Sequence, residues 1–387
     1  MSKALINNKI ISWALLRAGM SEDELADKMQ VRDEKVLSWL SGDDHPTFVQ
    51  AQKIAKILGI PFGYLYLTNP PEEKFPLTDF RTVGSVERNL DVNTKNFLQD
   101  VLYKRDWFKE YRIQQGHDNI EFIGSASLRM NPSDIAKDIL KKLKLLPRPK
   151  KGNFEDYLKF LVSQAEAAGI WVMRTSMVGS NNHRPLSVEV FRGVAISDPL
   201  VPLIIINSRD TKSAQIFTLA HELAHLWLGE SGISNVDLGK TEITQNSKVE
   251  AFCNRVAAEV LTPRDEFIER WKEQLHLEDQ VDDIAYTFKV SRVVVARRAF
   301  DLRLVNQADY LNFYRQEQAR WAKIAADQKE HSGAVPQHVM LPIRYGQRFT
   351  MSVLAEAVRG TMLLREASSL LGTKPSKMKE IYSKLRA

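Results

Sequence analysis

The sequence lacks three features that mark secreted or membrane proteins. Its 387 residues contain one cysteine, Cys253, so no disulfide can form within the chain. The short apolar run near the start is interrupted by charged and amide side chains, unlike a secretory signal peptide. The longest apolar run, 200–206, contains a proline and is too short to span a bilayer. We therefore expect a cytoplasmic protein that does not contact a membrane.

A strong excess of charge is also absent over most of the chain. Hydrophobic residues make up 44% of the sequence and charged residues 26%, which is ordinary for globular domains. The length suffices for two or three domains. Residues 329–387 hold ten basic and four acidic side chains, an excess of +6 that equals the formal net charge of the whole chain. This tail could contact nucleic acid or an acidic partner, or form only a solvated basic surface.

The clearest chemical signal is the pentapeptide His221-Glu222-Leu223-Ala224-His225. In a helix with about 3.6 residues per turn, His221 and His225 lie on one face, so both imidazoles can reach one metal ion. Glu222 lies beside them, where a carboxylate can take a proton from water at the metal. The flanks are uncharged and mostly apolar, as in a buried helix. The alternative is a packed helix whose two histidines share a face without binding metal.

A third ligand would favour the metal site, because catalytic zinc usually has three protein ligands and one open position. The helical pattern after residue 246 ends at Pro263 and places Glu250 and Asn254 one turn apart. Glu250 can complete a His₂Glu site, and Asn254 can accept a hydrogen bond that orients a ligand histidine. Glu259 is the rival ligand, but nine residues after Glu250 it points to the opposite side of the helix.

Residues 193–263 resemble the zinc metallopeptidase domain of the ImmA/IrrE family. The resemblance rests on two stretches, GVAISDPLVPLIIINSRDTKSAQIFTLAHELAHLWLG and EAFCNRVAAEVLTP. The second block of the family usually reads E-x-x-A-N-x-F-A-A-x-L-L-M-P, and its first Glu is the third zinc ligand. Here Cys253 and Val256 replace the usual Ala and Phe, and both replacements are apolar.

The resemblance implies that the protein is a regulatory zinc metallo-endopeptidase. Zn²⁺ would be held by His221, His225 and Glu250. Water at the zinc would be the nucleophile and Glu222 the general base. The substrate would be a peptide bond in a partner protein, a repressor or an antitoxin.

Residues 1–68 show a second pattern, in which short helices are broken at glycines and polar turns. Ser21 and Glu24 predict a capping box at the start of one of these helices. The pattern resembles the repressor-type, XRE-like helix-turn-helix family. The following helix, from about residue 32 to 41, would be the recognition helix.

Three side chains of that helix, Arg32, Lys35 and Ser38, could face a DNA groove. Residues 1–70 contain eight basic and eight acidic side chains, so their attraction to phosphates is weak. The N-terminal domain could therefore bind DNA, alone or as a homodimer, or could dock on a partner protein.

The whole pattern predicts an α+β fold that is mostly helical, with a zincin-like domain built on a small β-sheet. Strands are expected near 170–173, 188–191 and 203–206, followed by a helix that begins near Thr211. The expected domains are a helix-turn-helix domain at 1–68, a linker and helical segment at 69–150, the metallopeptidase domain at 151–270, and a helical C-terminal region at 271–387.

The C-terminal region contains a helix-turn-helix-like element at 281–298, with Ser291 as the cap of its second helix. Its basic residues could contact phosphate, or the element could complete the peptidase fold. For the whole chain, the alternative to an endopeptidase is a DNA-binding transcriptional regulator or antitoxin whose peptidase domain is structural or sensory. The presence of Glu222 favours the enzyme, because a scaffold would not need a general base.

Overall fold

The computed structural model describes residues 3–71, 78–79, 91–149, 151–234, 245–327 and 336–386. These residues fall into two compact units. The first lies within Met1–Pro76, Asn89–Tyr103 and Asn181–Pro185, and the second within Leu77–Arg88, Lys104–Ser180 and Leu186–Ala387. The predicted α+β fold, mostly helical with a small sheet, is confirmed. No helix in the described ranges is both long and apolar enough to cross a membrane.

The first unit contains a small helical bundle made of α1 (Asn8–Ala18), α2 (Glu22–Met29), α3 (Asp33–Ser41), α4 (Phe48–Leu58) and the 3₁₀ turn η1 (Phe62–Tyr66). The predicted capping box at Ser21 and Glu24 is present at the start of α2. Gln30 ends α2 in the left-handed conformation, so only three residues separate α2 from α3. Buried apolar side chains from all four helices form one core, including Ile10, Leu25, Val36, Trp39 and Ile54.

The second unit is built on a five-stranded sheet with the strand order β1-β5-β3-β4-β2. Its strands are β1 (Thr78–Asp79), β2 (Trp171–Thr175), β3 (Gly193–Ile196), β4 (Leu203–Asn207) and β5 (Gly232–Ser234). The central strand β3 runs antiparallel to both β4 and β5, whereas β2 pairs in parallel with β4. Every residue of β2, β3 and β4 is buried, which explains the continuous apolar runs in their sequences.

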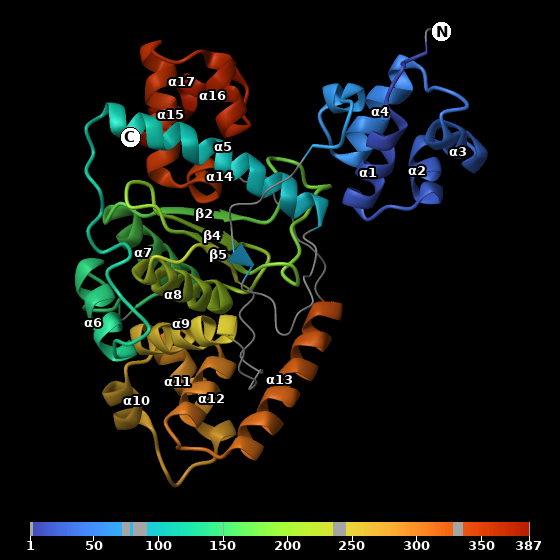
Figure 1. The fold of residues 1–387 in the computed structure, drawn as a ribbon. Helices are drawn as coiled ribbons and strands as arrows, with labels where there is room; N and C mark the ends of the chain where they lie inside the picture. The colour runs from blue at the N-terminus through green and yellow to red at the C-terminus, as the bar shows by residue number, and fades with distance from the viewer. Residues whose placement is uncertain are drawn as a thin grey trace. The chain divides into compact units, whose positions relative to one another are not determined.

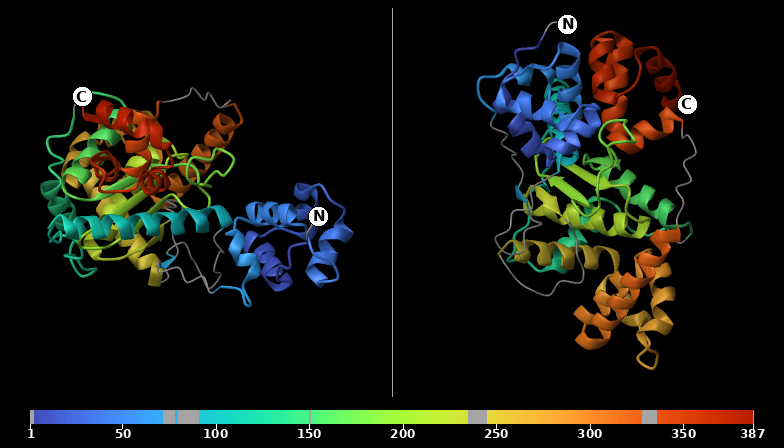
Figure 2. Two further views of the ribbon diagram at one scale, coloured as in Figure 1. Left: turned by 90° about the horizontal axis from the view of Figure 1, so that it is seen from above. Right: turned by 90° about the vertical axis from the view of Figure 1, so that its right-hand side faces the viewer.

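Helix α8 (Lys212–Leu228) lies between this sheet and α9 (Gln245–Leu261), as Figures 1 and 2 show. Helices α6 (Pro132–Lys142) and α7 (Phe154–Ala167) also pack against α8. Because α8 has neighbours on every side, all its residues from Gln215 to Trp227 are buried. The predicted helix start is confirmed, since the Thr211 side chain caps α8 by accepting from the backbone N–H of Ala214.

The strand predicted at 188–191 is wrong, because this segment forms a turn. The Ser187 hydroxyl accepts from the backbone N–H of Glu189, and the Ser187 carbonyl accepts from that of Val190. The buried Asn207 amide then donates to the carbonyl of Phe191 at 3.2 Å. These local hydrogen bonds replace a strand ladder and bend the chain into β3.

Four further helices, α10 (Arg264–Arg270), α11 (Leu277–Phe288), α12 (Arg292–Asp301) and α13 (Gln307–Asp327), extend the α8–α9 side of the unit. The predicted cap at Ser291 is confirmed. Val281, Ile284, Val294 and Val295 share one hydrophobic core with α8 and α9. The helix-turn-helix-like element at 281–298 therefore belongs to the hydrophobic core around α8 and α9.

The C-terminal helices are α14 (Gln337–Tyr345), α15 (Gln347–Arg359), α16 (Leu364–Leu371) and α17 (Met378–Arg386), with the 3₁₀ turn η2 (Pro375–Lys377) before α17. They are anchored to the sheet where α14 meets α15. Trp171 Nε1 donates to the carbonyl of Tyr345, and Phe349 stacks on Trp171 with ring centroids 4.6 Å apart. The remaining long helix, α5 (Val92–Gln114), is shared between the two units.

The anchor includes a buried carboxylate, Glu166, which accepts from the backbone N–H of Gln347 at 3.0 Å. Burial raises the pKa of Glu166 to about 7, although this hydrogen bond and the charge of Arg348 act in the opposite direction.

Because the pKa of Glu166 is higher in the folded chain than in the unfolded chain, its contribution to stability is complete below pH 4.5 and is lost as the pH rises through about 7. We expect Glu166→Gln, which stays neutral, to raise the free energy of unfolding by about 2 kcal/mol at pH 8 and to change it little at pH 4.5. Urea unfolding at the two pH values checks this prediction, and an equal effect at both would contradict it.

Candidate active site

The helix α8 presents the predicted histidines toward α9. Its N-terminus is capped by Thr211, and Gly229 ends it in the left-handed conformation with φ of 75°. His221 and His225 are one turn apart and almost completely buried. Their Nε2 atoms lie 3.1 Å apart, so both rings direct the same nitrogen into one small space.

The third group in this space is Glu250, from α9. Its Oε2 lies 3.2 Å from His221 Nε2, and its Oε1 lies 3.1 Å from His225 Nε2. The donor atoms of these three residues lie within 4.8 Å of one another, and among the described parts of the chain only they form a cluster that could hold a metal ion. Two imidazoles and a carboxylate are a donor set that suits zinc.

The predicted contact between Asn254 and a histidine is present: Asn254 Oδ1 lies 2.9 Å from His221 Nδ1. An amide oxygen can only accept, so Nδ1 of His221 carries the proton. That leaves Nε2, the nitrogen that faces Glu250, as the atom that would bind a metal once it has lost its own proton.

The rival ligand Glu259 lies elsewhere on α9. Its carboxylate accepts from Arg298 at 2.6 Å and belongs to the contact between α9 and α12. Cys253 is fully buried, and burial raises the pKa of its thiol well above the usual value. It therefore behaves as a small apolar side chain in the core.

The charges of the cluster fit a cation site. Burial opposes ionisation, but the neighbouring His221 charge holds the pKa of Glu250 at about 2. Burial alone would lower the pKa of His221, yet the charge of Glu250 raises it above the usual value. Burial lowers the pKa of His225, which favours the neutral imidazole that binds a metal.

Glu222 is fully buried next to the cluster, and neither of its carboxylate oxygens has a hydrogen-bond partner among the described residues. Burial raises the pKa of Glu222 to about 8, and the negative charge of Glu250 adds to this effect, whereas His221 opposes it. A divalent cation held by the cluster would act in the opposite direction and favour the carboxylate. Unpaired buried oxygens need a partner such as water, so their placement suits a group that holds a reacting water.

Two residues of the site have no signal in the sequence. Gly193 on β3 lies so close to α8 that an added Cβ would clash with Glu222 Oε1 and would lie 2.6 Å from Thr218 Cγ2. Ser234 on β5 is buried, with its Oγ 3.5 Å from His225 Nε2. Both residues come from strands that reach α8 only in the folded chain, so no spacing in the sequence indicates them.

The close approach at Gly193 gives a test. We expect Gly193→Ala to displace Glu222 and to lower the free energy of unfolding by about 2 kcal/mol, because the α8 backbone and the central strand cannot move apart freely. Gly63→Ala is the matched control, since no atom lies within 4 Å of the Cβ position there. Thermal unfolding of both variants checks the prediction, and equal melting temperatures would contradict it.

The residues predicted to face DNA extend from the N-cap of α3 to the middle of the helix. Arg32 is its N-cap residue and is exposed. Lys35 forms an ion pair with Asp44 at 2.5 Å, and Ser38 donates to the carbonyl of Lys35. Asp44 also pairs with Lys3, and these two lysines lower its pKa far below the usual value. Lys35, the one basic side chain within α3, is thus already paired with a carboxylate of its own unit.

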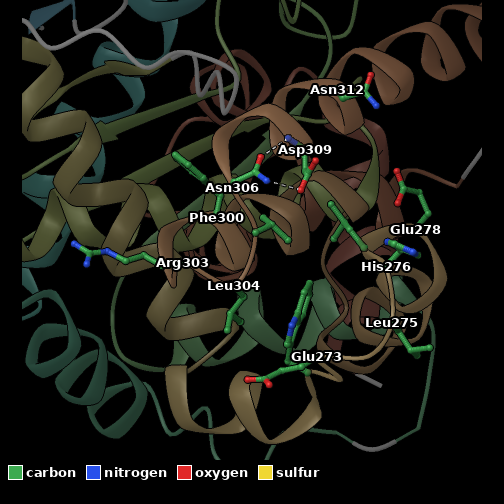
Figure 3. A pocket seen from close by; sticks show the side chains of 13 residues that line it. Glu273, Leu275, His276, Glu278, Phe300, Arg303, Leu304, Asn306, Asp309 and Asn312 are labelled. Atoms are coloured by element: carbon green, nitrogen blue, oxygen red, sulfur yellow. Dashed lines mark hydrogen bonds between the residues drawn. The ribbon is translucent and has the colours of Figure 1, made fainter.

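A hollow of about 950 Å³ lies between the loop after α10 and the α12–α13 connection. Figure 3 shows three carboxylates at its rim, from Glu273, Glu278 and Asp309, with Phe300 and Leu304 among the apolar lining. Asp309 accepts from the Asn306 amide at 2.9 Å. The hollow includes none of the His–Glu cluster.

Two parts of the chain match known families. Residues 165–300 match the IrrE N-terminal-like domain, and residues 11–65 match a helix-turn-helix family. The chain therefore has an IrrE-like domain that follows a helix-turn-helix domain. The predicted resemblance is therefore confirmed. The IrrE-like domain includes α8, α9 and also α11 and α12, so the match extends beyond the predicted end of the domain at residue 270.

The C-terminal helices have a separate match. Residues 345–384 match a domain of unknown function, DUF8813. A comparison of the chain with curated proteins finds no match. The match to the IrrE-like domain thus supports a metallopeptidase class, whereas substrate and mechanism depend on the residues of the site.

Proposed function

We propose that the protein is a cytoplasmic zinc endopeptidase that cuts a regulatory partner protein, a repressor or antitoxin. The observation that carries the proposal is the convergence of His221, His225 and Glu250 within 4.8 Å, with the buried Glu222 beside them. A metal cluster with no adjacent base would fit a structural zinc site equally well, whereas a free carboxylate beside the cluster has a use in catalysis.

Each residue of the site has a defined task. His221, His225 and Glu250 would hold Zn²⁺, which when bound polarises the scissile carbonyl and activates water. Asn254 fixes the His221 ring by accepting from its Nδ1. Glu222 takes the proton from water and delivers it to the leaving amine. Gly193 leaves the space that the Glu222 carboxylate occupies.

The substrate can be found without knowing it in advance. Cells that produce the wild-type protein are compared with cells that produce Glu222→Gln, and protein N-termini are identified by mass spectrometry. We expect a small set of new internal N-termini only with the wild type. Identical sets of N-termini would refute the proposal that the protein is a peptidase.

A second candidate function is a DNA-binding regulator whose IrrE-like domain is structural or sensory. It is favoured by the match of residues 11–65 to a helix-turn-helix family. The same comparison discriminates the two candidates, because a regulator of this kind would change transcript levels equally with wild type and Glu222→Gln and would create no new N-termini.

A further inference from the structure

Besides the connections at Gly19 and Gly59 inside the N-terminal bundle, three pairs of helices in the described residues have the same connection. In each pair, three residues join the helices, and the first of them is left-handed. These residues are Gln30 between α2 and α3 (φ 60°), Lys289 between α11 and α12 (φ 55°), and Gly372 between α16 and the η2–α17 helix (φ 58°). A short turn of this kind is the geometry of a helix-turn-helix.

The third pair has a burial pattern similar to that of the N-terminal pair. With an offset of 342 residues, each buried position of α2 and α3 falls on a buried or half-buried position of α16 and α17. The matched pairs are Leu25 with Ala367, Met29 with Leu371, Val36 with Met378, and Trp39 with Ile381. The left-handed turn residues Gln30 and Gly372 also coincide. By this alignment α17 occupies the place of a recognition helix.

In the first two pairs, several basic side chains near the turn have partners inside the protein, whereas Arg32 of the first pair is exposed and forms no ion pair with a described residue. Lys35 of the first pair binds Asp44. In the second pair, Arg292 binds Asp282 and Glu317, and Arg298 binds Glu259. Ion pairs of this kind reduce the charge available to a phosphate.

The third pair has three lysines at and after the turn that have no acidic partner among the described residues. Lys374, Lys377 and Lys379 are all exposed, and none of them forms an ion pair with a described residue. Lys374 matches Arg32 in the offset alignment, and Lys377 matches Lys35. Residues 336–386 hold nine basic and three acidic side chains. Of the acidic ones, Glu380 is paired with Lys384 and Glu356 with Arg359.

The anchoring contacts leave this basic surface uncovered within its unit. The C-terminal helices attach to the sheet through Tyr345, Gln347 and Phe349, which lie on α14 and α15. Figure 1 shows α15, α16 and α17 packed together as one group. The core of that group is made by apolar side chains that include Val353, Leu370, Met378 and Ile381, so the lysines lie on its outer surface.

We propose that α16 and α17 form a second helix-turn-helix that binds the phosphate backbone of duplex DNA through Lys374, Lys377 and Lys379. Residues 1–70, which include the N-terminal pair, carry no net charge. The C-terminal pair would therefore supply most of the electrostatic affinity for DNA. The contacts to phosphate fix the protein on the duplex without reading its sequence. This binding is independent of the proposed peptidase activity.

The test uses the full-length protein and a mixed-sequence duplex of about 20 base pairs, with fluorescence anisotropy at several salt concentrations. We expect Lys377→Gln/Lys379→Gln to weaken binding at least about 10-fold at low salt and to reduce the salt slope by about 2, because two phosphate contacts are lost. The matched control is Lys141→Gln/Lys142→Gln, which removes two exposed lysines from α6. Circular dichroism verifies that the variants are folded.

Two results would overturn the proposal. The first is that Lys377→Gln/Lys379→Gln binds the duplex with the affinity and salt slope of the wild type, while a second double variant, Arg32→Gln/Lys35→Gln, loses affinity for it. The other is no binding of the wild type to the duplex together with lysine-dependent binding to polyglutamate, which would identify the surface as a site for an acidic protein. A loss that is confined to Lys377→Gln/Lys379→Gln supports it.

Discussion

Glu222→Gln is expected to lower the rate of peptide hydrolysis by about 10²–10⁴-fold while leaving bound zinc unchanged. The amide is nearly isosteric with the carboxylate and fits beside Gly193, but it cannot take a proton from water. Glu222 is not one of the three converging donors, so the metal should remain. Turnover is measured with a peptide that spans the mapped cleavage site, and zinc is measured by atomic emission on the same samples.

The control for this variant is Glu230→Gln. Glu230 follows α8 and is exposed, so its change removes a charge near the same helix without touching the cluster. We expect wild-type turnover from it. If Glu222→Gln with full zinc content hydrolyses the peptide at the wild-type rate, Glu222 is not the general base.

Glu250→Ala is expected to have the second largest effect, a loss of zinc. The change removes the only carboxylate of the cluster and leaves two neutral imidazoles to hold a divalent cation. The loss of affinity should exceed the roughly 10–100-fold that changes to outer-shell residues cost. Competition with a fluorescent zinc chelator measures the dissociation constant directly.

Glu259→Gln is the matched control on the same helix. Glu259 binds Arg298, so its change removes a charge from α9 but no donor from the cluster. We expect it to bind zinc as tightly as the wild type. Zinc affinity that survives Glu250→Ala but falls in Glu259→Gln would reverse the assignment of the third ligand.

The His–Glu cluster was predictable from sequence because helix periodicity fixes it. The spacing of His221 and His225 places both rings on one face, and the same rule joins Glu250 to Asn254. The face of α8 with the histidines and the face of α9 with Glu250 meet when these two helices pack together. The apolar sequence of α8 favours this packing, because the helix must be covered on all sides. The distances of 3.1 and 3.2 Å between the histidines and Glu250 follow from this contact.

The remaining features depend on contacts between segments that are distant in sequence. Gly193 gives no local sign that its missing side chain makes room for Glu222, and Ser234 lies beyond the end of the motif. Residues 188–191 have the composition of a strand but form a turn. The Ser187 hydroxyl accepts from the backbone N–H of Glu189, and the Asn207 side chain donates to the carbonyl of Phe191, so these backbone groups need no neighbouring strand.

The basic surface on the C-terminal helices depends on both charge and fold. Its positive charge was visible in the sequence, where it equals the excess of the whole chain. The sequence left open whether that charge is a solvated surface or a binding site. The three-residue turn after α16 and the matching buried positions of α2 and α3 give the charge a defined geometry. Charge and geometry together support a nucleic-acid interface more strongly than either alone.

Removal and return of zinc tests the central claim most directly. The purified protein is stripped with a chelator, then reloaded with zinc, and cleavage of the identified partner is followed by mass spectrometry in parallel with the zinc content. We expect cleavage to disappear with the metal, to return at about one zinc per chain, and to stay at least about 100-fold slower in reloaded Glu222→Gln. Undiminished cleavage by the stripped protein would contradict the account.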